Sequence, residues 1–232
     1  IRQSTSDEGE GQPPALGYSV CSEGVDASPL PDGFGPRLRA LSPLCSLAAP
    51  HRMLPDPLRD TLEERLDAAI AQCTSVSGGC IANASRLETE NAPYFLKWGD
   101  ANVARTFPGE AAGLEAMAAA ETPLVVPEVV EHDTPDGERP GFLVLDWINT
   151  GRKGRRFWQS FGTGLAEMHR HTGEEYGFSM DNYIGRLPQS NTWMTAWPAF
   201  FREERLAPQV EMAREKGRWR SDWDRPLDTL YR

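Results

Sequence analysis

The sequence predicts an α+β fold in which an antiparallel sheet is followed by a mainly helical part. Residues 94–98 alternate as the side chains of a strand do, and most of them are β-prone. Residues 124–130 and 141–145 are two further strand-like runs, which a Pro-Asp-Gly turn at 135–137 joins. After residue 156, apolar side chains recur at helical spacing, at Phe157, Phe161, Leu165 and Met168.

Lys97 and Glu110 form the clearest chemical pattern. Lys97 shares a strand face with Phe95, because alternate residues of a strand point the same way. Glu110 stands in the first turn of a helix that Pro108 suits, roughly 40° from the centre of its apolar stripe. A carboxylate turned towards a core needs a cationic partner, and a strand lysine packed against the helix would supply one. The alternative is an ordinary strand lysine and a solvated glutamate.

The segments around these two residues follow the order of a kinase small lobe. Gly78-Gly79 lies between two strand-like segments, where backbone amides can hold phosphate oxygens, although a plain hairpin turn explains the glycines as well. After the glutamate helix come two strands and a polar connector at residues 146–148. A kinase-like fold has this order, and its lysine–glutamate pair holds the α- and β-phosphates of ATP.

Longer motifs continue along the chain. Those of the first part are Gly78-Gly79-Cys80-Ile81, Phe95-Leu96-Lys97, Gly109-Glu110-Ala111-Ala112-Gly113-Leu114, Phe142-Leu143-Val144-Leu145-Asp146 and Gly164-Leu165-Ala166-Glu167-Met168-His169. More distinctive are Tyr176-Gly177-Phe178, Asp181-Asn182-Tyr183-Ile184-Gly185, Pro188-Gln189-Ser190-Asn191-Thr192-Trp193 and Trp197-Pro198-Ala199-Phe200-Phe201-Arg202. From about residue 53 to the end, the chain resembles the fructosamine kinase (ketosamine-3-kinase) family, which is similar in fold to aminoglycoside phosphotransferases. Residues 177–206 are what distinguish this family from other kinase-like proteins.

The resemblance implies an ATP-dependent enzyme with Mg²⁺ as the second cofactor. It would phosphorylate a sugar hydroxyl of ketosamines (fructosamine or ribulosamine), as small molecules or on glycated proteins. The phosphorylated adduct then decomposes, which amounts to protein deglycation. Lys97 would hold the phosphates, and Glu110 would orient Lys97. The residues expected to bind the cofactor are Ser77, Gly78, Gly79, Cys80, Lys97, Asp146, Trp147 and Ile148.

The chain departs from the family pattern at one point. Family members carry a His-Gly-Asp-Leu-Trp-Ser-Gly-Asn catalytic loop and then a metal-binding aspartate, and the 232 residues contain no His-Gly-Asp. His169-Arg170-His171 has the wrong third residue and closes a helix. We therefore expect the catalytic base and the Mg²⁺ ligands beyond Arg232, and we expect the 232 residues alone to be an inactive fragment.

A protein-kinase-like fold of two lobes follows from this reading. Residues 53–147 would be the ATP-binding small lobe, and residues 148–232 an incomplete helical substrate lobe. Two alternatives remain. Another small-molecule kinase of this fold, of the aminoglycoside or choline type, would share Lys97 and Glu110 but not residues 182–193. The other alternative is a non-catalytic nucleotide-binding fragment.

Composition and charge limit the possible partners. With 24 Lys and Arg against 34 Asp and Glu, the formal net charge is −10, which argues against nucleic acid and anionic membranes. No apolar run approaches the roughly 20 residues of a membrane span. Four cysteines (Cys21, Cys45, Cys73 and Cys80) show no CxxC spacing, which predicts reduced thiols in the cytoplasm. The resemblance favours a redox-sensitive thiol at Cys80 that can link two chains into a homodimer, and a small buried hydrophobe is the alternative.

The two ends of the chain carry further patterns. Residues 1–52 are rich in Ser, Gly and Pro without periodicity, which predicts a disordered extension or translated upstream sequence. Met53 resembles a natural start, and Asp56 would cap a helix that carries Leu58, Leu62, Leu66 and Ile70. Near the other end, Trp193 and Trp197 are spaced as if on one helix face. Packing explains that spacing, and an aromatic wall beside a sugar is the functional alternative.

Overall fold

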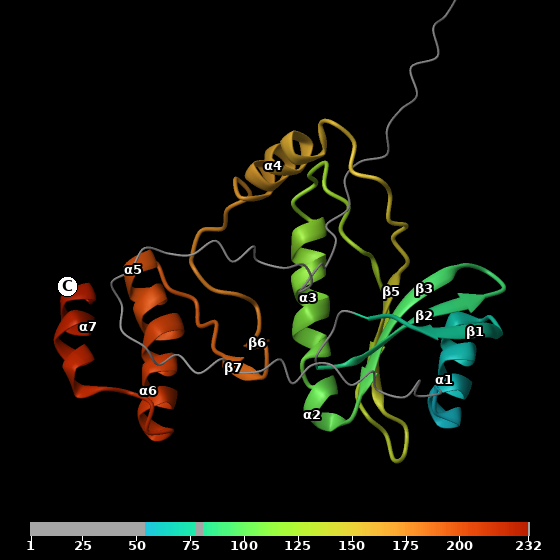
Figure 1. Ribbon diagram of the computed structural model, residues 1–232, viewed down its shortest axis with the longest axis horizontal. Coiled ribbons are helices and arrows are strands. Elements are labelled where there is room, and N and C mark those ends of the chain that lie inside the picture. Colours follow the sequence, from blue (N-terminus) through green and yellow to red (C-terminus); the bar gives the residue numbers. More distant parts are fainter. Residues whose placement is uncertain (1–53, 78–80, 232) are drawn as a thin grey trace, which may run out of the picture. The chain divides into compact units, whose positions relative to one another are not determined.

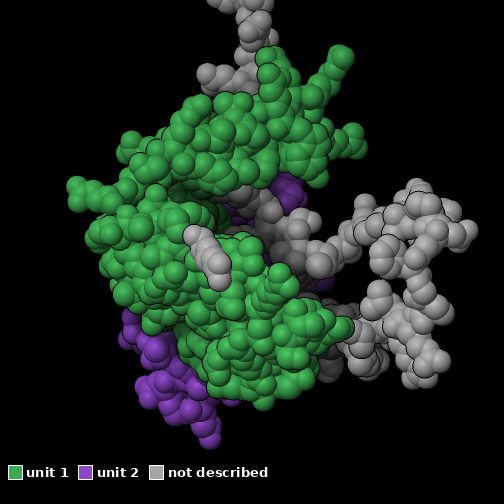
Figure 2. Space-filling view, turned by 90° about the vertical axis from the view of Figure 1, so that its left-hand side faces the viewer, with its two compact units in different colours: residues 1–14, 105–128, 152–232 green, residues 15–104, 129–151 purple. Residues whose placement is uncertain are grey.

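The computed structural model of the chain describes residues 54–77 and 81–231, which form two compact units (Figures 1 and 2). Among the described residues, unit 1 contains 105–128 and 152–231, and unit 2 contains 54–77, 81–104 and 129–151. The functional boundary after residue 147 stays a prediction, because the units are defined by packing alone. Residues 1–52 lie outside the described residues.

Unit 2 is a five-stranded antiparallel sheet with helix α1 packed on one face (Figure 1). In spatial order the strands are β1 (Ile70–Ser75), β2 (Asn83–Thr89), β3 (Pro93–Gly99), β5 (Gly141–Asp146) and β4 (Val129–Asp133). The helices of this unit are α1 (Asp56–Leu66) and the short α2 (Ala101–Ala104) after β3. The predicted pairing of the last two strands across the 135–137 turn is confirmed, and Gly137 supplies the positive φ of 56° that this turn needs.

Three local predictions were wrong. Strand β4 begins at Val129 rather than at residue 124, since Pro127 has no N–H for the ladder. Ile70 begins β1 instead of continuing the helix, because Asp67 turns the chain with a left-handed φ of 48° after Leu66. Asp56 does not cap α1. It lies in the first turn, and Pro55 precedes the helix without a side-chain cap.

The core of unit 2 lies between α1 and the sheet. Leu58 and Leu62 on α1 are fully buried against Leu96, Trp98 and other side chains of the central strands. Their four-residue spacing gives α1 its apolar stripe, and strand alternation directs every second residue of β3 towards it. The other residues of β3 therefore belong to the opposite face of the sheet.

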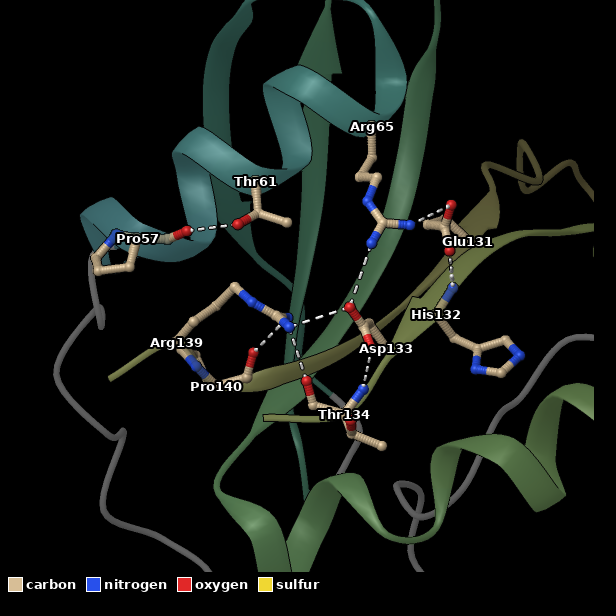
Figure 3. A network of polar contacts seen from close by, with 9 residues as sticks. All are labelled: Pro57, Thr61, Arg65, Glu131, His132, Asp133, Thr134, Arg139 and Pro140. Atoms are coloured by element: carbon tan, nitrogen blue, oxygen red, sulfur yellow. Dashed lines mark hydrogen bonds and ion pairs between the residues drawn. The ribbon is translucent and has the colours of Figure 1, made fainter. Parts of the chain in front are cut away.

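A polar network ties α1 to the edge of the sheet (Figure 3). Arg65 on α1 approaches Glu131 and Asp133 on β4, at 3.5 Å in each case. Asp133 also accepts a hydrogen bond from Arg139 at 3.0 Å, and the same Nη2 of Arg139 donates to the carbonyl oxygen of Thr134. Arg139 thereby closes the turn between β4 and β5, and α1 is held against the strand that borders this turn.

Unit 1 is mainly helical. Its helices are α3 (Phe107–Ala118), α4 (Phe157–Met168), α5 (Trp197–Phe200), α6 (Ala207–Glu215) and α7 (Asp224–Leu230), with a π-helical turn at Phe201–Leu206 and a 3₁₀ turn at Ser221–Trp223. A two-stranded hairpin, β6 (Asn182–Ile184) and β7 (Leu187–Gln189), interrupts the helices. The predicted helices at Pro108 and Phe157 are thus confirmed. Within the described part of the chain, no helix has the length and apolarity to cross a membrane.

Candidate functional site

Lys97 lies on β3, the middle strand of the sheet in unit 2. Strands β2 and β5 pair with β3 on its two sides, so this part of the backbone is hydrogen-bonded throughout. Leu96 and Trp98 point into the core with α1, and Lys97 therefore shares the opposite face with Phe95, as predicted. We call this side of the sheet the Lys97 face. The lysine is half-buried, so a rigid strand presents an ammonium group on a partly covered surface.

The predicted connector adjoins the same face. Asp146 ends β5, and Trp147 and Ile148 follow, all three half-buried. The Trp147 ring lies 6.4 Å from the ring of Phe95 and has the guanidinium of Arg86 over it, 4.6 Å from the ring centroid. Because Phe95 belongs to the Lys97 face, the indole of the connector is placed on that face too.

Arg86 was not foreseen from the sequence. It stands on β2 directly opposite Phe95, and its Nη2 forms an ion pair with Glu88 at 2.8 Å. Its Nε is buried without a hydrogen-bond partner in the described part of the chain. The alternation of β2 was the available signal, because it places Arg86 on the face that carries Ala84, the residue opposite Lys97.

The predicted phosphate loop is described only at its edge. Ser77 is exposed between β1 and β2, and the N–H of Val76 donates to the carbonyl oxygen of Ala84 at 2.9 Å. The antiparallel pairing of β1 and β2 confirms that the glycine segment links two neighbouring strands. Gly78, Gly79 and Cys80 themselves lie outside the described residues, and their role stays a prediction.

Glu110 lies in the first turn of α3, where its carboxylate is close to the positive end of the helix. It is half-buried, while Ala111 and Leu114 on the same helix are buried. Lys97 belongs to unit 2 and Glu110 to unit 1, so their pairing stays a prediction. Among the described residues, no three His, Cys, Asp or Glu side chains gather as a metal site would require.

Around the buried Asn191, residues between 180 and 205 form a polar network that the sequence analysis did not predict. Asn191, only 2% exposed, donates through its side chain to the carbonyl oxygen of Met180, and its backbone N–H donates to Asp181, both at 2.9 Å. Arg205 donates to the side-chain oxygen of Asn191 at 2.5 Å and to the carbonyl oxygen of Ser190 at 2.7 Å. Nothing in the sequence near Asn191 pointed to an arginine fourteen residues further on.

Two charges in this network have shifted pKa values. The Ser190 hydroxyl lowers the pKa of Glu204 by hydrogen bonding to its carboxylate, burial opposes this effect, and the hydroxyl and N–H of Thr192 reinforce it. Burial lowers the pKa of Arg205, and the neighbouring Glu204 partly offsets that change. The guanidinium also lies 4.5 Å from the ring centroid of Phe200. Arg205 and Glu204 thus both interact with other residues of unit 1.

An aromatic surface lies beside this network. The ring of Trp197 is 5.5 Å from Tyr176 and 5.4 Å from Phe201, and all three side chains are exposed. Trp193 is not on the helix of Trp197, contrary to the prediction, because α5 begins only at Trp197. Trp193 instead packs on Gly177, where a β-carbon would lie 2.8 Å from the indole. Gly177 is therefore a close-packing position, and a sugar-binding role of the tryptophans stays a prediction.

Comparison with known proteins places the chain. Residues 56–230 match the model of the family described as fructosamine kinase. The chain belongs to the fructosamine kinase family. A probable ketoamine kinase of Synechocystis is 39% identical over 148 residues, which are 63% of this chain and 49% of that protein. A chloroplastic protein-ribulosamine 3-kinase of Arabidopsis thaliana is 37% identical over 183 residues, which are 77% of this chain and 55% of that protein. An aminoglycoside- or choline-type kinase is not favoured.

Solved structures agree on the fold. A putative fructosamine-3-kinase of Thermobifida fusca has a TM-score of 0.62 at 25% identity and covers 75% of this chain and 60% of its own. A second one, of Haemophilus somnus, has a TM-score of 0.64 at 23% identity, with 75% and 59% covered. The predicted α+β, kinase-like fold is therefore confirmed. This fructosamine kinase chain spans about half the length of the curated relatives that it matches.

Proposed function

We propose that the chain is the nucleotide-binding part of an ATP-dependent kinase that phosphorylates a sugar hydroxyl of ketosamines. The observation that carries the proposal is the Lys97 face, where one half-buried lysine shares a sheet surface with Phe95 and the adjoining indole of Trp147. The names of the relatives, ketoamine kinase and ribulosamine 3-kinase, support the acceptor class. The relatives named for ribulosamine also support a protein-bound acceptor.

The residues of the Lys97 face suit the chemistry of a nucleoside triphosphate. A flat base packs against flat rings, and backbone amides and carbonyls at residues 146–148 can pair with its polar edge. The ammonium group of Lys97 would hold the α- and β-phosphate oxygens. Glu110 would hold Lys97 in the conformation that reaches them. Bound ATP supplies the transferable γ-phosphoryl group.

Positioning and charge stabilisation are the main contributions that such a site makes. The transition state of phosphoryl transfer spreads negative charge over oxygens, and a fixed cation costs no reorganisation as that charge develops. Lys97 is suited to this task because the strands on both sides fix its backbone. Mg²⁺ would neutralise the remaining phosphate charge, and we assign it no ligand among the described residues. A catalytic base is likewise assigned to no residue of this chain.

The test measures nucleotide binding first and turnover second. Binding of a non-hydrolysable ATP analogue to the 232-residue chain is followed by calorimetry. We expect Lys97→Met to weaken it at least tenfold and Glu110→Gln to weaken it less, because the glutamate acts only through the lysine. Lys216→Met, at an exposed lysine at the end of α6, is the matched control. Unchanged binding in Lys97→Met would overturn the assignment of the site.

Turnover is measured on this chain continued by the C-terminal half of the Synechocystis relative. Conversion of ATP into ADP is followed with a synthetic fructosamine, a synthetic ribulosamine or a glycated protein as acceptor. We expect ketosamine-dependent turnover from the extended protein and none from the 232 residues alone. Turnover that ignores the ketosamine would contradict the proposed acceptor.

We also propose that the Cys80 thiol is redox-sensitive and joins two chains when oxidised. Cys73 on β1 is a half-buried free thiol and serves as the internal comparison. Iodoacetamide labelling followed by mass spectrometry should modify Cys80 first, and ATP should protect it. A Cys80 that stays unlabelled without nucleotide would contradict this role. Localisation in the cytoplasm also remains a proposal, and fractionation of the source cells tests it.

A further inference from the structure

The β6–β7 hairpin packs against the first turn of α3, the turn that carries Glu110. Gly109 is the contact residue on the helix. A β-carbon built on Gly109 would lie 2.9 Å from Cβ of Asn182 and 3.4 Å from its Cα. Carbon atoms attract at about 3.5–4.0 Å and repel at shorter distances. The β-carbon of Asn182 therefore comes so close to the helix that a side chain at position 109, next to Glu110, would crowd it.

A second contact holds the start of the helix. The guanidinium of Arg105, just before α3 begins, lies over the ring of Tyr183 at 5.1 Å from the centroid. Asn182 and Tyr183 are consecutive residues of β6, so two neighbouring side chains of one strand meet two points on the start of α3. Two contacts restrict both the position and the direction of the helix, which a single contact does not do.

The hairpin is itself held firmly. Gln189 donates a hydrogen bond from Nε2 to Oδ1 of Asn182 at 2.9 Å, across the two strands. At its base, Asp181 accepts from the backbone of Asn191, which Arg205 in turn binds. The contacts thus run without a break from the π-helical turn through the polar network to Gly109. Through these contacts, residues 181–191 connect the π-helical turn to the start of α3.

We propose that Asn182 and Tyr183 are positioning residues, which fix the start of α3 and so the direction of the Glu110 carboxylate. The inference rests on the proposed function of Glu110 in orienting Lys97. Residues 182 and 183 belong to the segment 177–206, which distinguishes this family from other kinase-like proteins. The proposal gives these two residues a role in nucleotide binding. A displaced helix start would turn Glu110 away without removing any group that touches the nucleotide.

Two glycines of the same helix provide a matched test. A β-carbon added at Gly113 would meet nothing within 4 Å, whereas one added at Gly109 would meet Asn182 at 2.9 Å. Gly109→Ala should weaken binding of the ATP analogue to the 232-residue chain at least fivefold. Gly113→Ala should leave binding unchanged, because alanine there meets only space. Equal binding in the two variants would overturn the inference.

Adenosine distinguishes positioning from general damage. Adenosine lacks the phosphates that Lys97 would hold. A displaced Glu110 should therefore weaken binding of the ATP analogue but not binding of adenosine. Saturation-transfer NMR measures the binding of adenosine. A loosened fold would weaken both ligands alike and contradict the proposal. In a Glu110→Gln background, Gly109→Ala should add little further loss, because its effect passes through the missing carboxylate. Full additivity of the two losses would also contradict it.

Two further variants keep the test decisive if Gly109→Ala folds poorly. Adding Asn182→Gly removes the crowding β-carbon and should recover part of the lost binding. Tyr183→Leu removes the ring under Arg105 without crowding any backbone. It should weaken binding of the ATP analogue about threefold. Ile184→Val, at an exposed residue, is the control. Unchanged binding in Tyr183→Leu would overturn the role of that contact.

The proposed function and the positioning role fail separately. If Glu110→Gln itself leaves affinity for the ATP analogue unchanged, the proposed function of Glu110 is wrong and the inference falls with it. If Glu110→Gln weakens binding while Gly109→Ala and Tyr183→Leu do not, the proposed function stands and only the positioning role of the hairpin is wrong.

Discussion

The guanidinium of Arg86 on β2 lies over the indole of Trp147 at 4.6 Å from the ring centroid and so joins the sheet to the connector after β5. The ring of Phe95 is tilted towards the same indole, with the two ring centroids 6.4 Å apart. The connector has left the sheet at this point, so stacked side chains rather than ladder hydrogen bonds hold it in place. Arg86 is therefore expected to influence the base side of the proposed nucleotide site.

Arg86→Leu should weaken the binding of adenosine and of the ATP analogue by a similar factor, about twofold to fivefold. A partly exposed cation–π contact contributes about 0.5–1 kcal/mol, which corresponds to that range. Arg86→Lys should recover only part of the loss, because an ammonium group lacks the flat surface that stacks on the ring. Calorimetry and saturation-transfer NMR measure the two affinities.

A similar stack elsewhere in the chain supplies the control for Arg86. Arg220 lies over Trp223 at 5.6 Å and pairs with Asp222 at 2.7 Å, much as Arg86 pairs with Glu88. Arg220→Leu should change neither affinity. If both variants weaken binding equally, the loss reflects charge alone, and the stack on the connector has no specific role.

Two glycines of α4 should respond in opposite directions to alanine. A β-carbon on Gly164 would lie 2.7 Å from Cδ2 and 2.8 Å from Cγ of Leu124, which is buried, while Gly162 has nothing within 4 Å. Gly164→Ala should lower the free energy of unfolding by about 1–3 kcal/mol through overpacking. Gly162→Ala should raise it by up to about 1 kcal/mol, because alanine favours the helix. Urea unfolding measures both, and stabilisation by Gly164→Ala would contradict the close packing.

Asn191 is expected to be the most sensitive polar residue of unit 1. Its side chain donates to the carbonyl oxygen of Met180 and accepts from the guanidinium of Arg205, and Asn191→Leu would remove both hydrogen bonds. A typical hydrogen bond contributes about 0.5–1.5 kcal/mol to the free energy of unfolding, so the variant should unfold at a lower urea concentration. Thr163→Val, at an exposed residue of α4, is the control. Equal stability of the two variants would mean that water replaces the lost contacts.

Adding Arg205→Met to Asn191→Leu tests whether the two side chains are coupled. Both single variants remove the same hydrogen bond between Asn191 and Arg205, so the double variant should lose less than the sum of the two single losses. Strict additivity would show that the two side chains act independently, contrary to the 2.5 Å contact between them.

The sequence predicted those parts of the molecule that depend on short-range patterns. Alternation placed Lys97 and Phe95 on one face, and the Pro-Asp-Gly turn placed β4 beside β5, since both follow from neighbouring residues. The close approach of β6 to Gly109 joins residues more than seventy positions apart. No pattern within either segment specifies the other, so this contact required the structure.

Helical spacing of apolar residues also led to wrong predictions where the chain leaves the helix. Ile70 fits the four-residue spacing of α1, but the left-handed turn at Asp67 had already ended the helix. Trp193 and Trp197 share a helical spacing, yet Trp193 belongs to the segment that packs on Gly177. In both cases spacing alone did not reveal where the helix boundary lies.

Glu204 should make the stability of unit 1 depend on pH in the acid range. Hydrogen bonds from Ser190 and Thr192 lower the pKa of its carboxyl in the folded chain below its ordinary value, and burial opposes them only in part. A carboxyl with a depressed pKa stabilises the fold fully above its unfolded pKa, about 4.3, and loses that contribution as the pH falls through its folded pKa. Glu204→Gln should therefore be less stable than the natural chain at pH 7, by less than about 1 kcal/mol because the group is partly exposed.

The difference between Glu204→Gln and the natural chain should shrink as the pH falls from the unfolded pKa of a glutamate, about 4.3, through the lower folded pKa of Glu204. Urea unfolding between pH 7 and pH 3 measures this change. Glu203→Gln is the control, because the neighbouring carboxylate is exposed and pairs only with the surface cation Arg202 among the contacts that the described residues show. The stability difference at Glu204 could instead stay constant down to pH 3. That result would mean that the shape of the glutamate side chain, and not its charge, stabilises the fold.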